Sequence, residues 1–263
     1  MIEPLRSLND GLLLFGIDLK KLIRSMKGLP FYFRSLREIK RQLQKGENLF
    51  PLRRPILCLE DRFVESGSAS GHYFHQDLLV ARMIHLNNPG KHVDIGSRMD
   101  GFIAHLASFR AVEVMDLRPL ESTTANIRFV QSDLMKEVEA PYVDYCDSIS
   151  SLHAIEHFGL GRYGDKIEPR GYLLGLNNIY RILKRRGKFY FSVPIGPQRI
   201  EFNAHRVFGV RYLKELLVGK YEIDSFSYVD DQGRLHENAS LDGNIDANFG
   251  CFFGCGIFEL TKR

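Results

Sequence analysis

The most informative part of the sequence is the turn Val93-Asp94-Ile95-Gly96-Ser97-Arg98-Met99-Asp100-Gly101. A short apolar strand leads into Gly96, and a helix is expected over residues 101–109. A glycine at this place lets the backbone turn sharply and approach a ligand, and a helix N-terminus favours negative charge. A glycine after the first strand also serves packing in many α/β proteins. The turn therefore predicts the first strand–turn–helix unit of an α/β domain.

Helices and strands alternate on both sides of this turn. Apolar spacing predicts helices at 73–86, 101–109, 172–183 and 210–218, and strands at 92–95, 111–117, 127–130, 147–152, 188–193, 221–229 and 256–261. Such alternation is typical of a Rossmann-like, doubly wound and mostly parallel sheet. Ligands bind such sheets at the carboxyl ends of the strands, where the topology switches.

The first part of the chain differs from the rest. Residues 1–71 are expected to form a helical extension and connector, and 72–263 the Rossmann domain. Within 5–45 two helices are predicted, broken at Gly28-Leu29-Pro30 because proline opposes helix continuation. Residues 1–54 hold 12 Lys/Arg and 5 Asp/Glu, a balance of +7 within an overall +4. This basic extension suits peripheral membrane contact, an acidic partner, a homodimer interface or solvation; nucleic-acid binding is not expected.

Composition narrows the class of protein. With 44% hydrophobic and 26% charged residues the chain is expected to be globular. Four cysteines give no disulfide framework, and the sequence has no membrane span or signal peptide, so a cytoplasmic location is predicted, with the inner face of the membrane as the extension's target. The Cys251–Cys255 spacing is weak evidence for zinc, and no metal is assigned from it.

Acidic residues follow the second and third predicted strands. Asp116 comes 20 residues after Gly96, where a carboxylate can accept hydrogen bonds from both ribose hydroxyls. Asp133 ends the third strand, where it can meet an adenine amino group or cap a helix. Together these residues indicate a nucleotide-type cofactor, with NAD and S-adenosylmethionine as the alternatives.

Three later segments carry a resemblance over residues 72–263. Ser150–His157, Asn178–Pro194 and Gly254–Leu260 resemble the fourth motif, the following helix and fifth strand, and the last strand of class I methyltransferases. The resemblance implies an antiparallel last strand beside strand five and S-adenosylmethionine as cofactor, with S-adenosylhomocysteine as product. The cofactor-binding residues that it implies are Gln76, Asp94, Gly96, Ser97, Arg98, Gly101, Asp116, Leu117, Asp133 and Leu134.

One departure from that family concerns its Gly-x-Gly-x-Gly motif. Here Arg98 and Asp100 stand at the second and third glycine positions, and Gly101 follows one position later. An arginine beside the cofactor carboxylate is physically reasonable, because guanidinium and carboxylate pair bidentately.

A closer resemblance concerns the acceptor. The segments Gly71–Asp77, Asp94–Arg98, Glu156–Asp165 and Phe202–Arg206 are similar to a small bacterial family of methyltransferase-like proteins linked with surface polysaccharide synthesis. This resemblance implies a small-molecule or glycan acceptor derived from a sugar. Arg162, Tyr163 and Arg170, at the glycine-containing loop 159–165, are candidates to hold a phosphate or sugar, or belong to an ordinary surface loop.

Histidines gather where the methyl group is expected. His153, Glu156 and His157 follow the fourth strand, His205 follows the fifth, and these four are the candidate catalytic residues, with a histidine as the base that accepts a hydroxyl proton. An alternative is a divalent ion held by His153, Glu156 and His157. His72 and His75, before the first strand, are expected in the wall of the cofactor or acceptor site, or as buried structural histidines.

Three functions are consistent with these features. The first is an S-adenosylmethionine-dependent O-methyltransferase acting on a sugar, sugar nucleotide or glycan. The second is an NAD-dependent oxidoreductase, which Gly96 and Asp116 alone would suit. The third is a non-catalytic, cofactor-binding scaffold in polysaccharide assembly, suggested by the altered glycine motif and the basic extension.

Overall fold

The structure, a computed structural model, describes residues 11–45 and 50–263. It divides into two compact units, Met1–Ser68 and Ala69–Arg263. The first contains α2 (Leu19–Leu43) and the short 3-10 helix η1 (Asp61–Phe63). None of the helices in the described residues is long and apolar enough to cross a membrane.

The helix α2 corrects the expectation of two helices broken at residues 28–30. It runs through Pro30 without ending, and Asp18 caps its first turn by accepting hydrogen bonds from Lys20 N and Lys21 N. A proline removes one backbone donor, and a helix of 25 residues keeps enough other hydrogen bonds to continue. Gly28 has another purpose, because a Cβ there would lie 1.9 Å from the Leu59 carbonyl oxygen. Residues 5–10 of that expectation lie outside the described residues.

The second unit is built on one eight-stranded sheet with the order β3-β2-β1-β4-β5-β10-β8-β9. Its strands are β1 (His92–Ile95), β2 (Val112–Asp116), β3 (Ile127–Gln131), β4 (Cys146–Leu152), β5 (Leu183–Ile195), β8 (Tyr221–Val229), β9 (Leu235–His236) and β10 (Gly254–Lys262). The first five are parallel, and β10 lies antiparallel between β5 and β8. The Rossmann-like fold with an antiparallel last strand is confirmed.

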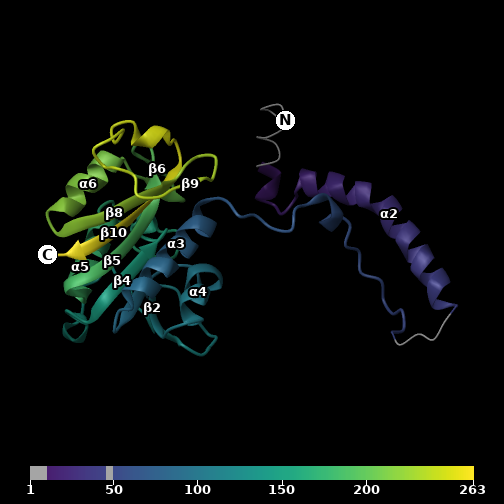
Figure 1. Ribbon diagram of the computed structural model, residues 1–263, viewed down its shortest axis with the longest axis horizontal. Coiled ribbons are helices and arrows are strands. Elements are labelled where there is room, and N and C mark those ends of the chain that lie inside the picture. The colour runs from purple at the N-terminus through teal and green to yellow at the C-terminus, as the bar shows by residue number, and fades with distance from the viewer. Residues whose placement is uncertain (1–10, 46–49) are drawn as a thin grey trace. The chain divides into compact units, whose positions relative to one another are not determined.

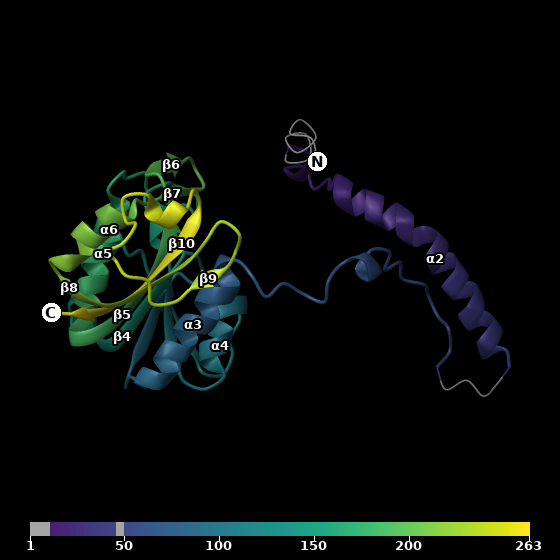
Figure 2. The same ribbon diagram turned by 45° about the horizontal axis from the view of Figure 1, so that its top comes forward.

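Helices cover both faces of this sheet (Figures 1 and 2). They are α3 (His72–Asn87), η2 (Met99–Ile103), α4 (Ala104–Ala107), α5 (Gly171–Ile182) and α6 (Val210–Val218), with short 3-10 turns η3 (Ala140–Tyr142), η4 (Ile155–His157) and η5 (Asn248–Gly250). Each face has its own apolar core: α3, η2 and α4 pack on one, α5 and α6 on the other. The helix expected at 101–109 is shorter, because it starts as a π-helical turn kinked at Gly101.

Strand order reverses between β1 and β4, since the chain adds β2 and β3 on one side of β1 and then β4 on the other. The loops after β1 and β4 therefore diverge and leave a crevice at the carboxyl ends of the strands. A hairpin of β6 (Arg199–Glu201) and β7 (His205–Val207) follows β5 and reaches over this end of the sheet (Figure 2). A backbone bridge between Ile195 and Phe208 fixes the hairpin to β5.

Two neighbouring positions of α3 test the packing of this unit. Ile84 is fully buried and Leu86 is 75% exposed. We expect Ile84→Ala to lower the free energy of unfolding by about 2–5 kcal/mol, because it leaves a cavity among well-packed side chains. The control Leu86→Ala should change it by no more than about 0.5 kcal/mol. Urea unfolding followed by circular dichroism measures both, and equal effects would contradict this packing.

Candidate active site

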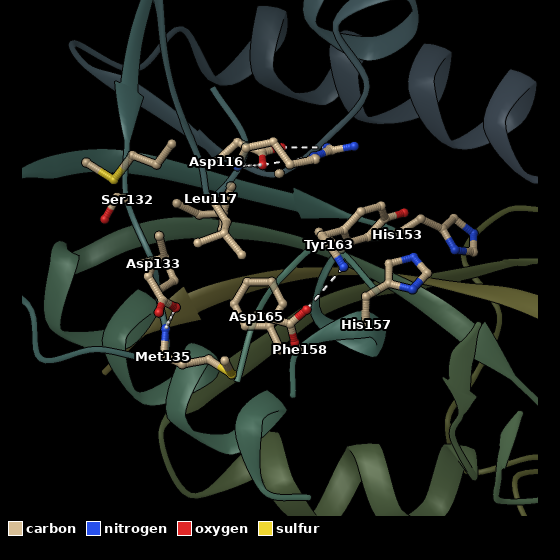
Figure 3. Close-up of a pocket in the computed structure, with 16 residues that line it drawn as sticks. Asp116, Leu117, Ser132, Asp133, Met135, His153, His157, Phe158, Tyr163 and Asp165 are labelled. Atoms are coloured by element: carbon tan, nitrogen blue, oxygen red, sulfur yellow. Dashed lines mark hydrogen bonds and ion pairs between the residues drawn. The ribbon is translucent and has the colours of Figure 1, made fainter. Parts of the chain in front are cut away.

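Two adjoining pockets open at the carboxyl ends of the parallel strands. The first, drawn in Figure 3, is lined by Ile95, Gly96, Met115, Asp116, Leu117, Arg118, Ser132, Asp133, Leu134, Met135, His153, Ala154, His157, Phe158, Tyr163 and Asp165. These residues come from the ends of β1, β2, β3 and β4. Figure 3 shows Asp133 and Met135 at one end of the pocket and His153 and His157 at the other. The strand ends at which the sequence predicted functional residues thus line one cavity.

The turn after β1 is fixed by a buried carboxylate. Asp94 is fully buried and accepts hydrogen bonds from Ser97 N (2.9 Å), Ser97 Oγ (2.7 Å) and Ser150 Oγ (2.5 Å). Burial raises the pKa of Asp94 to about 6, although these hydrogen bonds oppose the rise. Gly96 has φ of 70°, and a Cβ there would lie 3.1 Å from the Ala154 side chain. A glycine is therefore required between this turn and the loop after β4.

Asp116 ends β2 with its carboxylate held by an arginine. Its Oδ1 accepts hydrogen bonds from Arg118 N (2.8 Å) and Nε (3.1 Å), and its Oδ2 accepts one from Arg118 Nη2 (2.7 Å). The Arg118 guanidinium also lies 4.5 Å from the centre of the Tyr163 ring. Asp116 therefore has a polar partner within the pocket, which any hydroxyl ligand has to replace or share.

Not all predicted cofactor residues lie in this pocket. Gly96, Asp116, Leu117, Asp133 and Leu134 line it, and Asp133 Oδ1 accepts a hydrogen bond from Met135 N at 3.0 Å.

The remaining five predicted cofactor residues are placed differently. Asp94 and Ser97 are buried in the turn beneath the pocket, and Gly101 faces Asp77. Arg98 pairs with Asp100 and lines the second pocket. Gln76 is 1% exposed, and its Oε1 accepts a hydrogen bond from Ser192 Oγ inside the core. These five side chains are thus not part of the first pocket.

The second pocket is rich in cationic and aromatic side chains. It is lined by His72, Tyr73, Gly96, Arg98, Arg118, Leu152, His153, Glu156, His157, Arg162, Tyr163, Pro194, Ala204, His205 and Phe253. It shares Gly96, Arg118, His153, His157 and Tyr163 with the first pocket, so the two are continuous. Among the described residues that line it, three are arginines and Glu156 is the only acid. All four predicted catalytic residues lie here.

His153 and Glu156 form a buried pair beside both pockets. His153 Nδ1 lies 2.7 Å from Glu156 Oε1, and the two side chains are 6% and 1% exposed. Burial acts against the charged imidazole, but neighbouring Cys255 and the Glu156 carboxylate outweigh it and hold the pKa of His153 well above its usual value. Burial likewise opposes the Glu156 carboxylate, and His153 outweighs it and lowers the pKa of Glu156. This pair holds the loop after β4.

His157 is in a different protonation state. Burial lowers the pKa of His157, so the ring is neutral near pH 7. Its Nδ1 lies 2.6 Å from the Ala204 carbonyl oxygen, which can only accept a proton. Nδ1 therefore carries the hydrogen, and Nε2 keeps a free lone pair. His205 lies across the pocket, with Nε2 3.1 Å from Glu201 Oε2 and its ring against Phe253.

Hydrogen bonds within the loop 159–165 fix its shape, and Arg162 and Tyr163 are exposed. Asp165 accepts hydrogen bonds from Gly159 N, Gly161 N and Tyr163 N, and this places the Tyr163 ring against His157 at 5.4 Å. Arg162 Nη1 donates to the Ala204 carbonyl.

Arg206 is a positioning residue that sequence reasoning missed. It is 5% exposed and donates to the carbonyl oxygens of Glu156, Phe158 and Pro169. The arginine of Asn203-Ala-His-Arg206 was visible in the sequence, but its partners lie more than 35 positions away. No local pattern signals such contacts.

Comparisons with solved structures agree on the fold. The 1,6-didemethyltoxoflavin-N1-methyltransferase of Burkholderia thailandensis, solved with 1,6-didemethyltoxoflavin and S-adenosylhomocysteine, is 16% identical, with 72% of this chain and 78% of that chain covered and a TM-score of 0.51. N-methyltransferase NodS of Bradyrhizobium japonicum WM9 is 14% identical, with 74% and 99% covered and a TM-score of 0.50. The second unit thus has the Rossmann-like methyltransferase fold.

Sequence comparison gives the family. None of the curated proteins matches the chain. One family model matches residues 110–245, more than half of the 263 residues, and is described as "Caenorhabditis protein of unknown function, DUF268". The matched segment runs from β2 through the histidine loop after β4 to the loop before β10. The chain therefore belongs to the DUF268 family.

Proposed function

We propose that this protein is an S-adenosylmethionine-dependent O-methyltransferase whose acceptor is a sugar derivative that carries negative charge. The observation that carries the proposal is the joined pair of pockets. One runs along the ends of β1, β2 and β3 past Asp116, and it meets the arginine-rich second pocket at His153 and His157. Two substrates placed in these pockets would meet beside the two histidines.

The side chains of the first pocket match the chemical groups of the cofactor. Asp116 offers two carboxylate oxygens for a ribose, Asp133 a further acceptor, and Ile95, Leu117, Leu134, Met135 and Phe158 apolar surface for a flat base. The glycine at position 96 keeps the backbone open at the turn between the two pockets. When bound, S-adenosylmethionine supplies an electrophilic methyl group on a positively charged sulfur.

The second pocket suits an anionic acceptor. Arg98 and Arg162 line it together with Arg118, and arginine is the side chain best matched to phosphate and carboxylate oxygens. Tyr73, Tyr163 and Phe253 add aromatic surface, on which sugar rings pack well. A sugar nucleotide or another charged sugar combines both features. This supports the acceptor class that the resemblance to polysaccharide-associated proteins implies.

His157 is the best-placed base. Methyl transfer to a hydroxyl forms a C–O bond, breaks the C–S bond with the electron pair going to sulfur, and releases the hydroxyl proton. His157 is neutral, its Nε2 accepts no hydrogen bond from the described residues and lies 3.8 Å from Glu156 Oε1, and its side chain lines both pockets. His153 is less suitable, because its high pKa and its contact with Glu156 leave it protonated near neutral pH. We therefore assign the hydroxyl proton to His157 Nε2.

The cofactor assignment predicts the effect of removing Asp116. Asp116→Ala should weaken S-adenosylhomocysteine binding about 10- to 100-fold, because hydrogen bonds to a charged acceptor are lost. The matched control Asp242→Ala, at a side chain that is 91% exposed and outside both pockets, should bind as the unchanged protein does. Isothermal titration measures both. The cofactor assignment would be contradicted if the unchanged protein did not bind S-adenosylhomocysteine, or if it bound NADH instead.

The acceptor assignment predicts a dependence on charge. S-adenosylhomocysteine release should be faster with sugar nucleotides or sugar phosphates than with the matching neutral sugars. Arg162→Gln should raise KM for the charged acceptors about 10-fold, because it loses a charge-assisted hydrogen bond, and leave kcat nearly unchanged. Arg170→Gln, outside both pockets, is the control. Equal rates with neutral and charged sugars would contradict an anionic acceptor.

The base assignment predicts a loss in kcat. His157→Asn keeps an amide donor for the Ala204 carbonyl but has no basic nitrogen, so kcat should fall about 10²- to 10⁴-fold with little change in KM. The control His85→Asn, on α3 and outside both pockets, should retain full activity. A kcat for His157→Asn within a few-fold of the unchanged enzyme would mean that another group takes the proton.

A further inference from the structure

Three side chains from distant parts of the chain meet at the inner wall of the second pocket. His72 begins α3, His153 follows β4, and Cys255 lies on β10. One nitrogen of each histidine and the Cys255 sulfur all lie within 4.8 Å of one another. The two imidazole rings are stacked with centroids 5.3 Å apart. Among the described residues, this is the only group of three such side chains close enough to share a metal ion.

His153 carries an unsatisfied atom in this cluster. Its Nε2 is buried and has no nitrogen or oxygen partner among the described residues, and the Cys255 side chain is its neighbour. A buried polar atom without a partner costs about 1–3 kcal/mol, so such atoms usually have a ligand. The other nitrogen, Nδ1, is held by Glu156 at 2.7 Å. In the metal-free protein His153 is protonated, so a metal ion at Nε2 has to displace that proton. His153 then donates Nδ1–H to Glu156 and presents Nε2, the arrangement found behind metal-bound histidines.

His72 and Cys255 also have surroundings that suit a metal ligand. The His72 ring makes a hydrogen bond with the Phe253 backbone and stacks on the His153 ring, so its place in the cluster is fixed. Cys255 is fully buried, and its closest hydrogen-bond partner is Gln76 Oε1 at 3.6 Å, a weak contact. A cysteine sulfur is among the ligands that zinc prefers.

We propose that His72, His153 and Cys255 bind a zinc ion. Two imidazoles and a thiolate are the donors that Zn²⁺ takes in tetrahedral sites, at about 2.0–2.3 Å. Because His72 and His153 line the second pocket, the fourth position of the ion opens into it. Three protein ligands and one open position are the pattern of a catalytic rather than a structural zinc.

This set differs from the alternative that the sequence raised. His153 belongs to both, but Glu156 sits behind His153 as its hydrogen-bond acceptor, and His157 Nδ1 is held by Ala204. In the proposed ligand set Cys255 and His72 replace Glu156 and His157. The ion's open position would bind an oxygen of the acceptor and make its hydroxyl more acidic, which assists proton removal. This role, unlike the site itself, rests on the proposed function.

The test uses the metals alone on the full chain, freed of metal by a chelator and kept reduced. We expect Zn²⁺ to bind with 1:1 stoichiometry and to raise Tm, because it binds only the folded state. Co²⁺ should bind at the same place and give a thiolate-to-metal charge-transfer band and the visible bands of four-coordinate cobalt. Glu156→Gln should weaken Zn²⁺ binding about 10- to 100-fold through the orientation of His153.

Matched variants separate this site from adventitious binding. Cys255→Ser and His72→Ala should each weaken Zn²⁺ binding by more than about 100-fold, beyond the loss of an outer partner. The controls are Cys251→Ser, the other buried cysteine of the last segment, and His75→Ala, one turn along α3; both should bind as the unchanged protein does. Circular dichroism of the four variants without metal checks that each one folds. If Cys255→Ser does not fold, His72→Ala tests the site instead, because position 72 is partly exposed.

Three results would overturn the site: no stoichiometric Zn²⁺, a cobalt complex without the charge-transfer band, or equal affinity in the ligand and control variants. An S-adenosylhomocysteine titration of the metal-free protein runs in parallel. If the protein binds S-adenosylhomocysteine but does not bind zinc, only the metal site is overturned. If it binds zinc but does not bind S-adenosylhomocysteine, only the proposed function is overturned.

Discussion

The buried carboxylate of Asp94 is the interaction on which the site depends. It lies at the point where strand order reverses, and it accepts hydrogen bonds from Ser97 on its own loop and from Ser150 on β4. Ser97 Oγ in turn accepts a hydrogen bond from Leu152 N, one residue before His153. The turn that opens the first pocket and the histidine loop are therefore held by one network, and a shift in either strand end moves both pockets.

Two further polar pairs complete this edge of the sheet, and they differ in burial. The His153–Glu156 pair is almost entirely buried, and its strength comes from the low dielectric around it. In the Asp116–Arg118 pair the arginine side chain is 50% exposed and the aspartate 14%. Exposed pairs of this kind contribute little to stability. The first pair is thus suited to hold the loop after β4 in place, while the second can be exchanged for a ligand without loss of the fold.

Sequence reasoning predicted what depends on local pattern. The bounds of α3, β1, α6 and β8 were predicted almost to the residue, although α3 buries Leu79 and Val80 and leaves Leu78 exposed. The prediction was wrong at Pro30, where a close contact with the backbone of Leu59 explains Gly28 and the helix continues. In the site, residues at strand ends such as Asp116 were predictable from topology. Arg206 and the meeting of His72 with Cys255 were not, since these contacts join residues that only the folded sheet brings together.

Arg118 couples the two pockets, because it is the one arginine, among the described residues, that lines both. With the first pocket empty its guanidinium neutralises Asp116. Ribose hydroxyls carry no charge, so a cofactor that takes over the Asp116 oxygens leaves the arginine without its counter-ion. Its contact with the Tyr163 ring, 4.5 Å from the ring centre, keeps the guanidinium near the boundary of the pockets, where an anionic acceptor is the remaining partner. The proposed cofactor thus increases the positive charge that faces the proposed acceptor, which favours binding of the cofactor first.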